Sequence, residues 1–307
     1  MAARLPTFLV IGAGKAGTTA CYYYLRAHPE IYMSPVKEPR FFAFDGRRPS
    51  YPGRVYGEWP ENVVVDLDAY RRLFDGATNE RALGEASPQY LSTPGTAERI
   101  RAHIPNVSLV AILRDPAERA YSQFLHMVRD GFEPERDFLA ALDAEPDRVR
   151  DGWAPAFHYT TRAFYYRNLS SYFAAFDRSQ IRVYLYEEFR RDTARVLRDT
   201  YAFVGVNPDF LPDLAVTYNV SGIPKNRLLF TAYDRLLRAA RAAERKGFVP
   251  ARVLDRGVVA SASTAFQRWL LERPPMPPEA HARLRALYRE DTIELQGLIG
   301  RDLSGWL

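Results

Sequence analysis

Residues 7–28, TFLVIGAGKAGTTACYYYLRAH, decide the fold. Residues 8–11 form a short, continuous apolar run, which is typical of a strand that is covered on both faces of a parallel sheet. Glycines follow at positions 12, 14 and 17, and a helix is predicted to begin near Gly17. A strand, a glycine-rich turn and a helix in this order predict an anion-binding loop, because such a turn lets backbone N–H groups and the helix N-terminus face a phosphate.

Further apolar runs predict three more strands, at 31–34, 107–113 and 181–186. Helical patterns lie between and after them, at 66–74, 95–103, 116–129, 164–176, 192–204, 225–243 and 279–298. Strands that alternate with helices predict an α/β protein with a three-layer, P-loop-like fold, in which helices flank a central, mostly parallel sheet. Two irregular stretches, 43–63 and 244–264, are predicted to be acceptor-side loops. We find no repeat and no linker, and therefore expect one domain over residues 1–307.

The composition is that of a globular protein. The chain has 307 residues, of which 47% are hydrophobic and 26% charged, so it is not disordered, collagen-like or a coiled coil. No apolar run approaches the ~18 residues that a membrane span needs, and the N-terminal run is too short for a secretory signal. We therefore expect no membrane span and a cytoplasmic location. The single cysteine, Cys21, excludes an internal disulfide and a cysteine-based metal cage.

The excess of basic over acidic residues favours an anionic ligand. The net charge is +5, which suits nucleic acid or any other anion. The basic residues are scattered, however, and there is neither a recognition helix nor an RNA-binding motif, so nucleic acid is not expected as a partner.

The glycine-rich loop at 12–19, GAGKAGTT, is the strongest functional signal. Lys15 supplies a compact positive charge, and the hydroxyls of Thr18 and Thr19 can bond phosphate oxygens. The loop is not a Walker A motif, since Lys15 is followed by alanine and glycine rather than by serine or threonine. The alternative interpretation is a tight strand–helix turn without a ligand, and the lysine argues against it.

A second motif follows the strand at 107–113. Arg114 ends this strand, a helix begins at once, and Ser122 lies eight residues after Arg114, two turns into that helix. Both residues can reach a second anion at the carboxyl edge of the sheet, where open α/β folds bind ligands. The alternative is that Arg114 pairs with Asp115 or Glu118 and that Ser122 has no special role.

Taken together, the two motifs resemble those of the sulfotransferases that use 3′-phosphoadenosine 5′-phosphosulfate (PAPS). The resemblance spans nearly the whole chain and implies three groups of nucleotide-binding residues. The 5′-phosphosulfate loop would be Gly14, Lys15, Ala16, Gly17, Thr18 and Thr19. The 3′-phosphate motif would be Arg114 and Ser122, and the segment 218–227 resembles a nucleotide-closing loop with Lys225, Asn226 and Arg227.

The resemblance also implies a reaction. Residues 37–42, KEPRFF, are similar to the acidic segment of the heparan-sulfate branch, which makes Glu38 the catalytic base, and Lys15 would neutralise the leaving phosphate. The enzyme would move a sulfuryl group from PAPS to a hydroxyl of a carbohydrate, lipid or small-molecule natural product by in-line displacement. PAP would be the product, and no metal would be required. The alternative for Glu38 is a salt bridge with Lys37 or Arg40 on a loop.

Acceptor contacts are predicted more weakly, at Lys37, Arg40, His126 and His158. The tyrosines at 22–24 and the aromatic loop at 41–59 indicate an acceptor with a flat or apolar surface, although some of these aromatic residues, Tyr23 among them, are expected to belong to the core. The segment 84–90, GEASPQY, resembles a Ser/Thr-Pro-x-Tyr segment of the heparan-sulfate branch. The chain departs from that branch at two positions. It has Ala86 where those enzymes have a lysine, and Arg40 where they have a histidine. These departures leave the nucleotide motifs intact but do not favour a heparan-like acceptor.

The main rival is a P-loop kinase that acts on a small molecule. It is disfavoured because Lys15 has no adjacent serine or threonine to bind magnesium and because no predicted strand ends in a Walker-B-like aspartate. The sequence leaves open whether the protein forms a homodimer.

Overall fold

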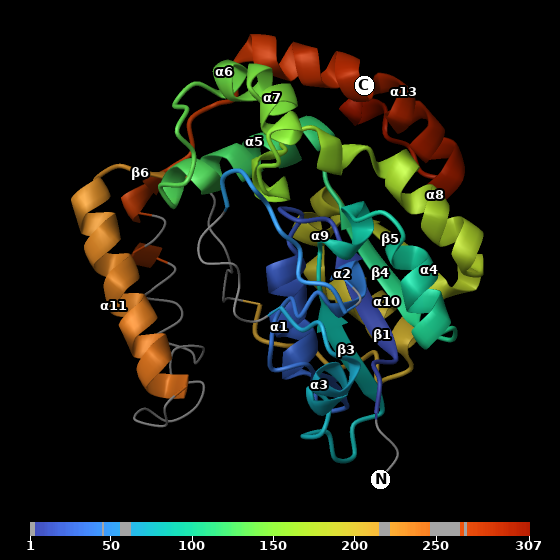
Figure 1. Ribbon diagram of the computed structural model, residues 1–307. Coiled ribbons are helices and arrows are strands. Elements are labelled where there is room, and N and C mark those ends of the chain that lie inside the picture. The colour runs from blue at the N-terminus through green and yellow to red at the C-terminus, as the bar shows by residue number, and fades with distance from the viewer. Residues whose placement is uncertain (1–3, 45, 56–62, 215–221, 246–264, 267–268) are drawn as a thin grey trace.

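The computed structural model describes residues 4–44, 46–55, 63–214, 222–245, 265–266 and 269–307 (Figure 1). Its centre is a five-stranded parallel sheet with the strand order β2-β3-β1-β4-β5. The strands are β1 (Phe8–Gly12), β2 (Ile31–Met33), β3 (Ala82–Ala86), β4 (Ser108–Leu113) and β5 (Ile181–Leu185). The prediction of a parallel central sheet is confirmed.

Strand β3 was not predicted from the sequence. Its residues, ALGEA, include alanine, glycine and glutamate, which are depleted in strands. It is nevertheless completely buried between β2 and β1. Gly84 has a packing reason to be there, because a Cβ at this position would lie only 2.1 Å from the ring of Phe8 on β1.

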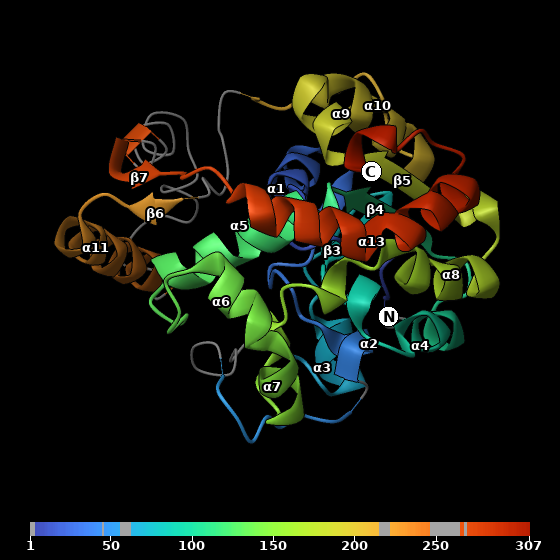
Figure 2. The ribbon, with the colours of Figure 1, turned by 90° about the horizontal axis from the view of Figure 1, so that it is seen from above.

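Helices cover both faces of the sheet, as Figure 2 shows from above. One face carries α1 (Thr18–Ala27), α9 (Tyr186–Arg191) and α10 (Thr193–Val204), and the other carries α4 (Thr96–His103) and α8 (Tyr165–Ala175). The three-layer arrangement is therefore confirmed. Shorter helices lie in the connections: α2 (Phe41–Phe44), α3 (Leu67–Arg72), α6 (Phe138–Asp143) and α7 (Glu145–Arg150). Of these only α3 was predicted, since helices of four to six residues show too little periodicity to detect.

The carboxyl ends of the strands face two long helices. The chain enters β1 at the bottom of Figure 1, so the strands end toward the top, beneath α5 (Pro116–Arg129) and α13 (Pro278–Ile299). From β1 the chain proceeds to β2 on one side of the sheet, and from β4 it proceeds to β5 on the other. This makes the ends of β1 and β4 the switch point at which α/β sheets form their binding crevice.

A separate helix stands beside this body. It is α11 (Arg227–Arg245), which follows β6 (Ile223–Pro224); β6 pairs in antiparallel fashion with β7 (Leu271–Glu272) (Figures 1 and 2). Of the two predicted irregular stretches, 244–264 begins inside α11, and its remainder lies outside the described residues. In 43–63, α2 takes the first two residues, and the described residues 46–55 form neither helix nor strand.

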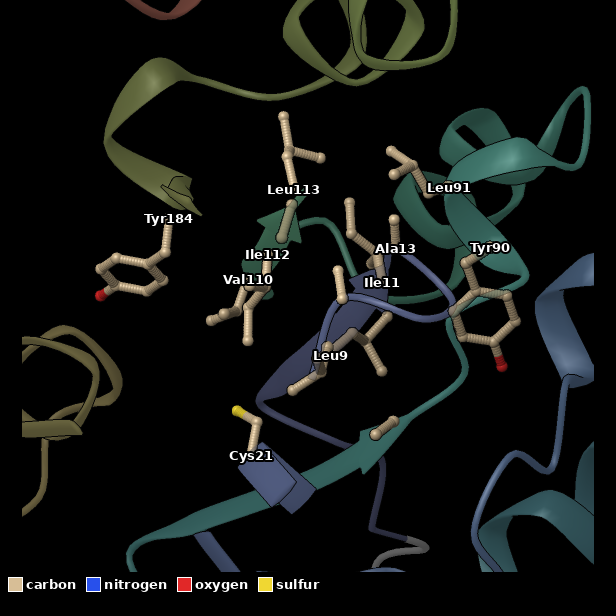
Figure 3. Packing of buried hydrophobic residues seen from close by; sticks show 14 of the residues in the cluster. Leu9, Ile11, Ala13, Cys21, Tyr90, Leu91, Val110, Ile112, Leu113 and Tyr184 are labelled. Atoms are coloured by element: carbon tan, nitrogen blue, oxygen red, sulfur yellow. The ribbon is translucent and has the colours of Figure 1, made fainter. Parts of the chain in front are cut away.

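The core corrects one interpretation of the aromatic residues. Figure 3 shows side chains of β1 and β4 packed against Tyr90 and Leu91, which follow β3. Phe41, Phe42 and Tyr22 belong to the same core, with at most 2% of each exposed. These rings therefore stabilise the fold and cannot offer an acceptor a flat surface. Within the described residues, no helix is both long and apolar enough to cross a bilayer.

Candidate active site at the carboxyl edge of the sheet

The loop between β1 and α1 is built as an anion cradle. The Ala13 N–H donates to the carbonyl of Ile112 on β4 at 2.7 Å, which ties the loop to the neighbouring strand. Gly17 has a φ of 86°, and a Cβ there would lie 3.2 Å from the rings of Tyr186 and Phe189, so only glycine suits this position. Helix α1 has no acidic residue in its first turn and no side chain capping its start. Its positive end therefore faces the loop.

Lys15 is the charged group of this loop. It is half-buried and has a φ of 71°. Burial, together with the positive charges of Arg129 and Arg114, lowers the pKa of Lys15 to about 7. A basic group whose pKa is lowered by cationic neighbours gains proton affinity when an anion binds beside it.

Arg114 connects this loop to a second basic site. It directly follows β4, and its guanidinium donates to the Lys15 carbonyl at 3.2 Å and to Glu118 at 2.9 Å. The ion pair that sequence reasoning offered as an alternative therefore exists. Burial and the nearby Arg273 lower the pKa of Arg114. The guanidinium also lies 4.9 Å from the ring centroid of Tyr186.

A cavity of about 390 Å³ opens on Arg114. It is lined by four arginines, two glutamates and a tyrosine: Arg114, Arg190, Arg191, Arg273, Glu118, Glu187 and Tyr186. Arg273 comes from the segment after β7 and contacts Glu118 at 2.5 Å, so residues far apart in the sequence meet here. Sequence reasoning missed Arg273, Arg190, Arg191 and Tyr186. Tyr186 had a signal, since it is the last residue of the predicted strand at 181–186 and directly follows β5 in the structure.

The other predicted nucleotide contacts lie near α5. Ser122 is on α5, one turn after Glu118, and is 1% exposed. Lys225, Asn226 and Arg227 are exposed at the junction of β6 and α11. Asn226 caps α11 by accepting from the Leu229 N–H at 3.1 Å. The Arg227 guanidinium is 3.1 Å from where a Cβ would stand on Gly131, just beyond the end of α5.

Glu38 lies in an ion cluster on the β2–α2 connection. Its carboxylate contacts Lys37 at 2.5 Å and Arg40 at 2.7 Å, so both salt bridges of the alternative interpretation form. Burial acts to raise the pKa of Glu38, but the two cations outweigh it and lower the pKa to about 2. Lys37 and Arg40, predicted as acceptor contacts, are thus held by Glu38. The Glu38 N–H donates to the carbonyl of Ala86 at 3.1 Å, which fastens the segment to β3.

A buried polar network on and after β3 holds the segment that carries Glu38 and Arg40. Glu85 on β3 is completely buried and accepts hydrogen bonds from Ser87 at 2.8 Å and Tyr70 at 3.2 Å. Ser87 in turn accepts from the Arg40 N–H at 3.0 Å. Burial raises the pKa of Glu85 to about 7, against the opposing effect of its hydrogen bonds. The segment 84–90 therefore positions Glu38 through the Ala86 carbonyl and Arg40 through Ser87.

The two candidate histidines lie in different surroundings. Burial and the charge of Lys15 hold the pKa of His126 well below its usual range, and Arg129 contacts its Nδ1 at 2.6 Å. His126 thus shares the neighbourhood of Lys15 in its neutral form. Burial and the charge of Arg162 lower the pKa of His158. Its buried Nε2 finds no hydrogen-bond partner in the described part of the chain. Among those residues, no group of three or more His, Cys, Asp or Glu side chains is arranged to hold a metal ion.

Comparison with known proteins identifies the family and supports the fold. The model of the sulfotransferase family matches residues 6–209. A crystal structure of a sulfotransferase from Alicyclobacillus acidocaldarius is 32% identical, with a TM-score of 0.74 over 99% of both chains. The chain belongs to the sulfotransferase family, as the sequence motifs predicted.

Two longer proteins are also similar. The mouse bifunctional heparan sulfate N-deacetylase/N-sulfotransferase 4 is 27% identical over 320 residues, which cover 99% of this chain and 31% of that protein. Human carbohydrate sulfotransferase 15 is 33% identical over 152 residues, which cover 40% of this chain and 27% of that protein. The chain therefore spans about a third or less of the length of these two relatives.

Proposed function

We propose that the protein is a PAPS-dependent O-sulfotransferase, which moves a sulfuryl group to a hydroxyl of a carbohydrate, lipid or small-molecule natural product. One observation carries the proposal. The 3.2 Å hydrogen bond from Arg114 to the Lys15 carbonyl joins two basic sites, the loop after β1 and the arginine-lined cavity after β4. A nucleotide with separate 5′ and 3′ anions matches such a pair of sites.

The nucleotide is assigned to these sites by charge. The 5′-phosphosulfate would lie on the loop, held by the backbone of 14–19, by Lys15 and by the hydroxyls of Thr18 and Thr19. The 3′-phosphate would be bound by Arg114 and Ser122, together with Arg273, which lines the same cavity as Arg114. Lys225, Asn226 and Arg227 would close over the nucleotide from the α11 side.

The chemistry then requires a base and a countercharge. The acceptor oxygen attacks sulfur, its proton passes to Glu38, and the bond from sulfur to the phosphate oxygen breaks. Lys15 stabilises the charge that grows on the departing PAP. A bound phosphosulfate competes with Glu38 for Lys37 and Arg40, and negative charge nearby raises the pKa of a carboxyl group. Donor binding thus makes Glu38 a stronger base than it is in the free protein.

The acceptor class rests on the relatives. The names of two of them refer to heparan sulfate and to carbohydrate, which supports a carbohydrate hydroxyl first among the three classes. A single domain and a cytoplasmic location remain predictions from the sequence, which leaves open whether the protein forms a homodimer.

Ligand-induced stabilisation tests the donor assignment. Binding to the native state stabilises it by RT ln(1 + [L]/Kd), so PAP at ~100 Kd is expected to add roughly 2.7 kcal/mol to the free energy of unfolding. AMP lacks the 3′-phosphate and is expected to give a much smaller rise in Tm at equal concentration. Equal shifts with PAP and AMP would refute the assignment of Arg114 and Ser122.

A further inference from the structure

Arg162 is a further cation at this site, and no sequence motif marks it. It lies in the short 3₁₀ turn η3 (Thr161–Ala163) before α8. One terminal nitrogen of its guanidinium is 3.7 Å from the point where a Cβ would stand on Gly14. Its Nε lies 3.3 Å from the hydroxyl of Ser92. The guanidinium therefore lies directly over the glycine-rich loop.

The surroundings of Arg162 favour the binding of an anion. Burial and the positive charges of Arg119 and Arg40 lower the pKa of Arg162 to about 10, so it stays charged at neutral pH. Glu38 opposes this lowering, as does Tyr51. The Glu38 carboxylate is already bonded to Lys37 and Arg40, with one oxygen on each. The region between Gly14 and Glu38 therefore carries an excess of positive charge, from Arg162, Lys37 and Arg40.

We propose that Arg162 is a further catalytic residue, which donates hydrogen bonds to the non-bridging oxygens of the sulfuryl group as that group passes from donor to acceptor. The inference rests on the proposed function. In that function the sulfur must lie between the loop that holds the phosphosulfate and the base that activates the acceptor, and Arg162 faces both. Its planar fork can hold two oxygens of one anion at once. PAP lacks the sulfuryl group, so this contact is made with PAPS only.

The rival role for Arg162 is to bind a negative group on the acceptor. The contact with the Gly14 region argues against it, because it places the guanidinium over the donor loop. The two roles make different predictions for a neutral acceptor, and the test uses that difference.

The test compares Arg162→Gln and Arg162→Lys with Arg167→Gln, a matched control on the exposed surface of α8. In Arg162→Gln, kcat is expected to fall by about 10²-fold, as on loss of one donor to a developing charge. The fall should be equal for neutral and anionic acceptors. Arg162→Lys keeps the charge and loses the fork, so it should recover part of the rate. The control should match the wild type.

Binding gives a readout that does not depend on turnover. Calorimetry is expected to show the PAP affinity of Arg162→Gln within a few-fold of wild type, while the preference for PAPS over PAP is lost. A rate loss confined to anionic acceptors, an unchanged kcat, or PAP affinity that falls as much as PAPS affinity would each overturn the proposal. A wild-type protein that binds PAPS and PAP but transfers no sulfuryl group would refute the proposed function, while the PAPS-over-PAP preference would still decide whether Arg162 contacts the sulfuryl group.

Discussion

Replacement of Glu38 by glutamine is expected to abolish most sulfuryl transfer to an alkyl alcohol or sugar hydroxyl. Glutamine keeps the shape of the side chain and removes its basicity, and general-base catalysis typically contributes 10²–10⁴-fold. The affinity for PAP should stay within a few-fold of wild type, because the 3.1 Å backbone contact that fastens the segment to Ala86 remains. Steady-state kinetics with PAPS and calorimetry with PAP measure the two quantities.

The chemistry of the acceptor offers an internal control for this variant. A phenol is more acidic than an alkyl alcohol and needs less help to lose its proton, so the rate penalty should shrink with phenolic acceptors. Glu98→Gln, on the exposed side of α4, serves as the matched control. Full activity of Glu38→Gln toward an alkyl alcohol would assign the base to another residue. His126 would be the next to test, since its lowered pKa keeps it neutral beside Lys15.

Replacement of Lys15 by alanine is expected to lower kcat by about 10²-fold or more, and to weaken PAP binding less. The ammonium group stabilises charge that grows on the leaving phosphate, so it acts mainly in the transition state. Near-normal turnover in Lys15→Ala would restrict the loop to a binding or structural role.

Lys15 also predicts a pH dependence. Its pKa of about 7 in the free protein means that the required ammonium form is lost as the pH rises through neutrality. The kcat/KM for PAPS should therefore decline above about pH 7 in the wild type. Lys15→Arg stays charged and should not show this decline. The same decline of kcat/KM above about pH 7 in both proteins would assign the titration to another group.

The fold followed from the sequence wherever periodicity was long or apolar runs were continuous. Helix α5 occupies 116–129 as predicted, because its apolar side chains recur with the helical period and Asp115 and Pro116 mark its start. Strand β3 escaped detection because close packing of Gly84 against Phe8, rather than β-propensity, places it in the sheet. The sequence predicted that some residues of the aromatic loop belong to the core but did not single out Phe41 and Phe42, because exposure cannot be inferred from aromatic composition alone.

The candidate site was predictable only for residues that stand in a local sequence motif. Lys15, Arg114 and Glu38 stand in local motifs, and the parallel topology brings the ends of β1 and β4 together. Arg273 and Arg162 reach the same region through packing of the segment after β7 and of η3, and no local pattern marks either residue. Such contacts depend on tertiary structure, which one sequence does not reveal.

The most direct test of the central claim is transfer of sulfur-labelled sulfuryl from PAPS to a panel of carbohydrate, lipid and phenolic hydroxyls in the presence of EDTA. We expect the wild-type protein to label an acceptor without added magnesium, and Arg114→Ala to require far more PAPS for the same rate. Transfer of phosphate from ATP that depends on magnesium, with no sulfuryl transfer to any acceptor, would contradict the account and indicate a kinase.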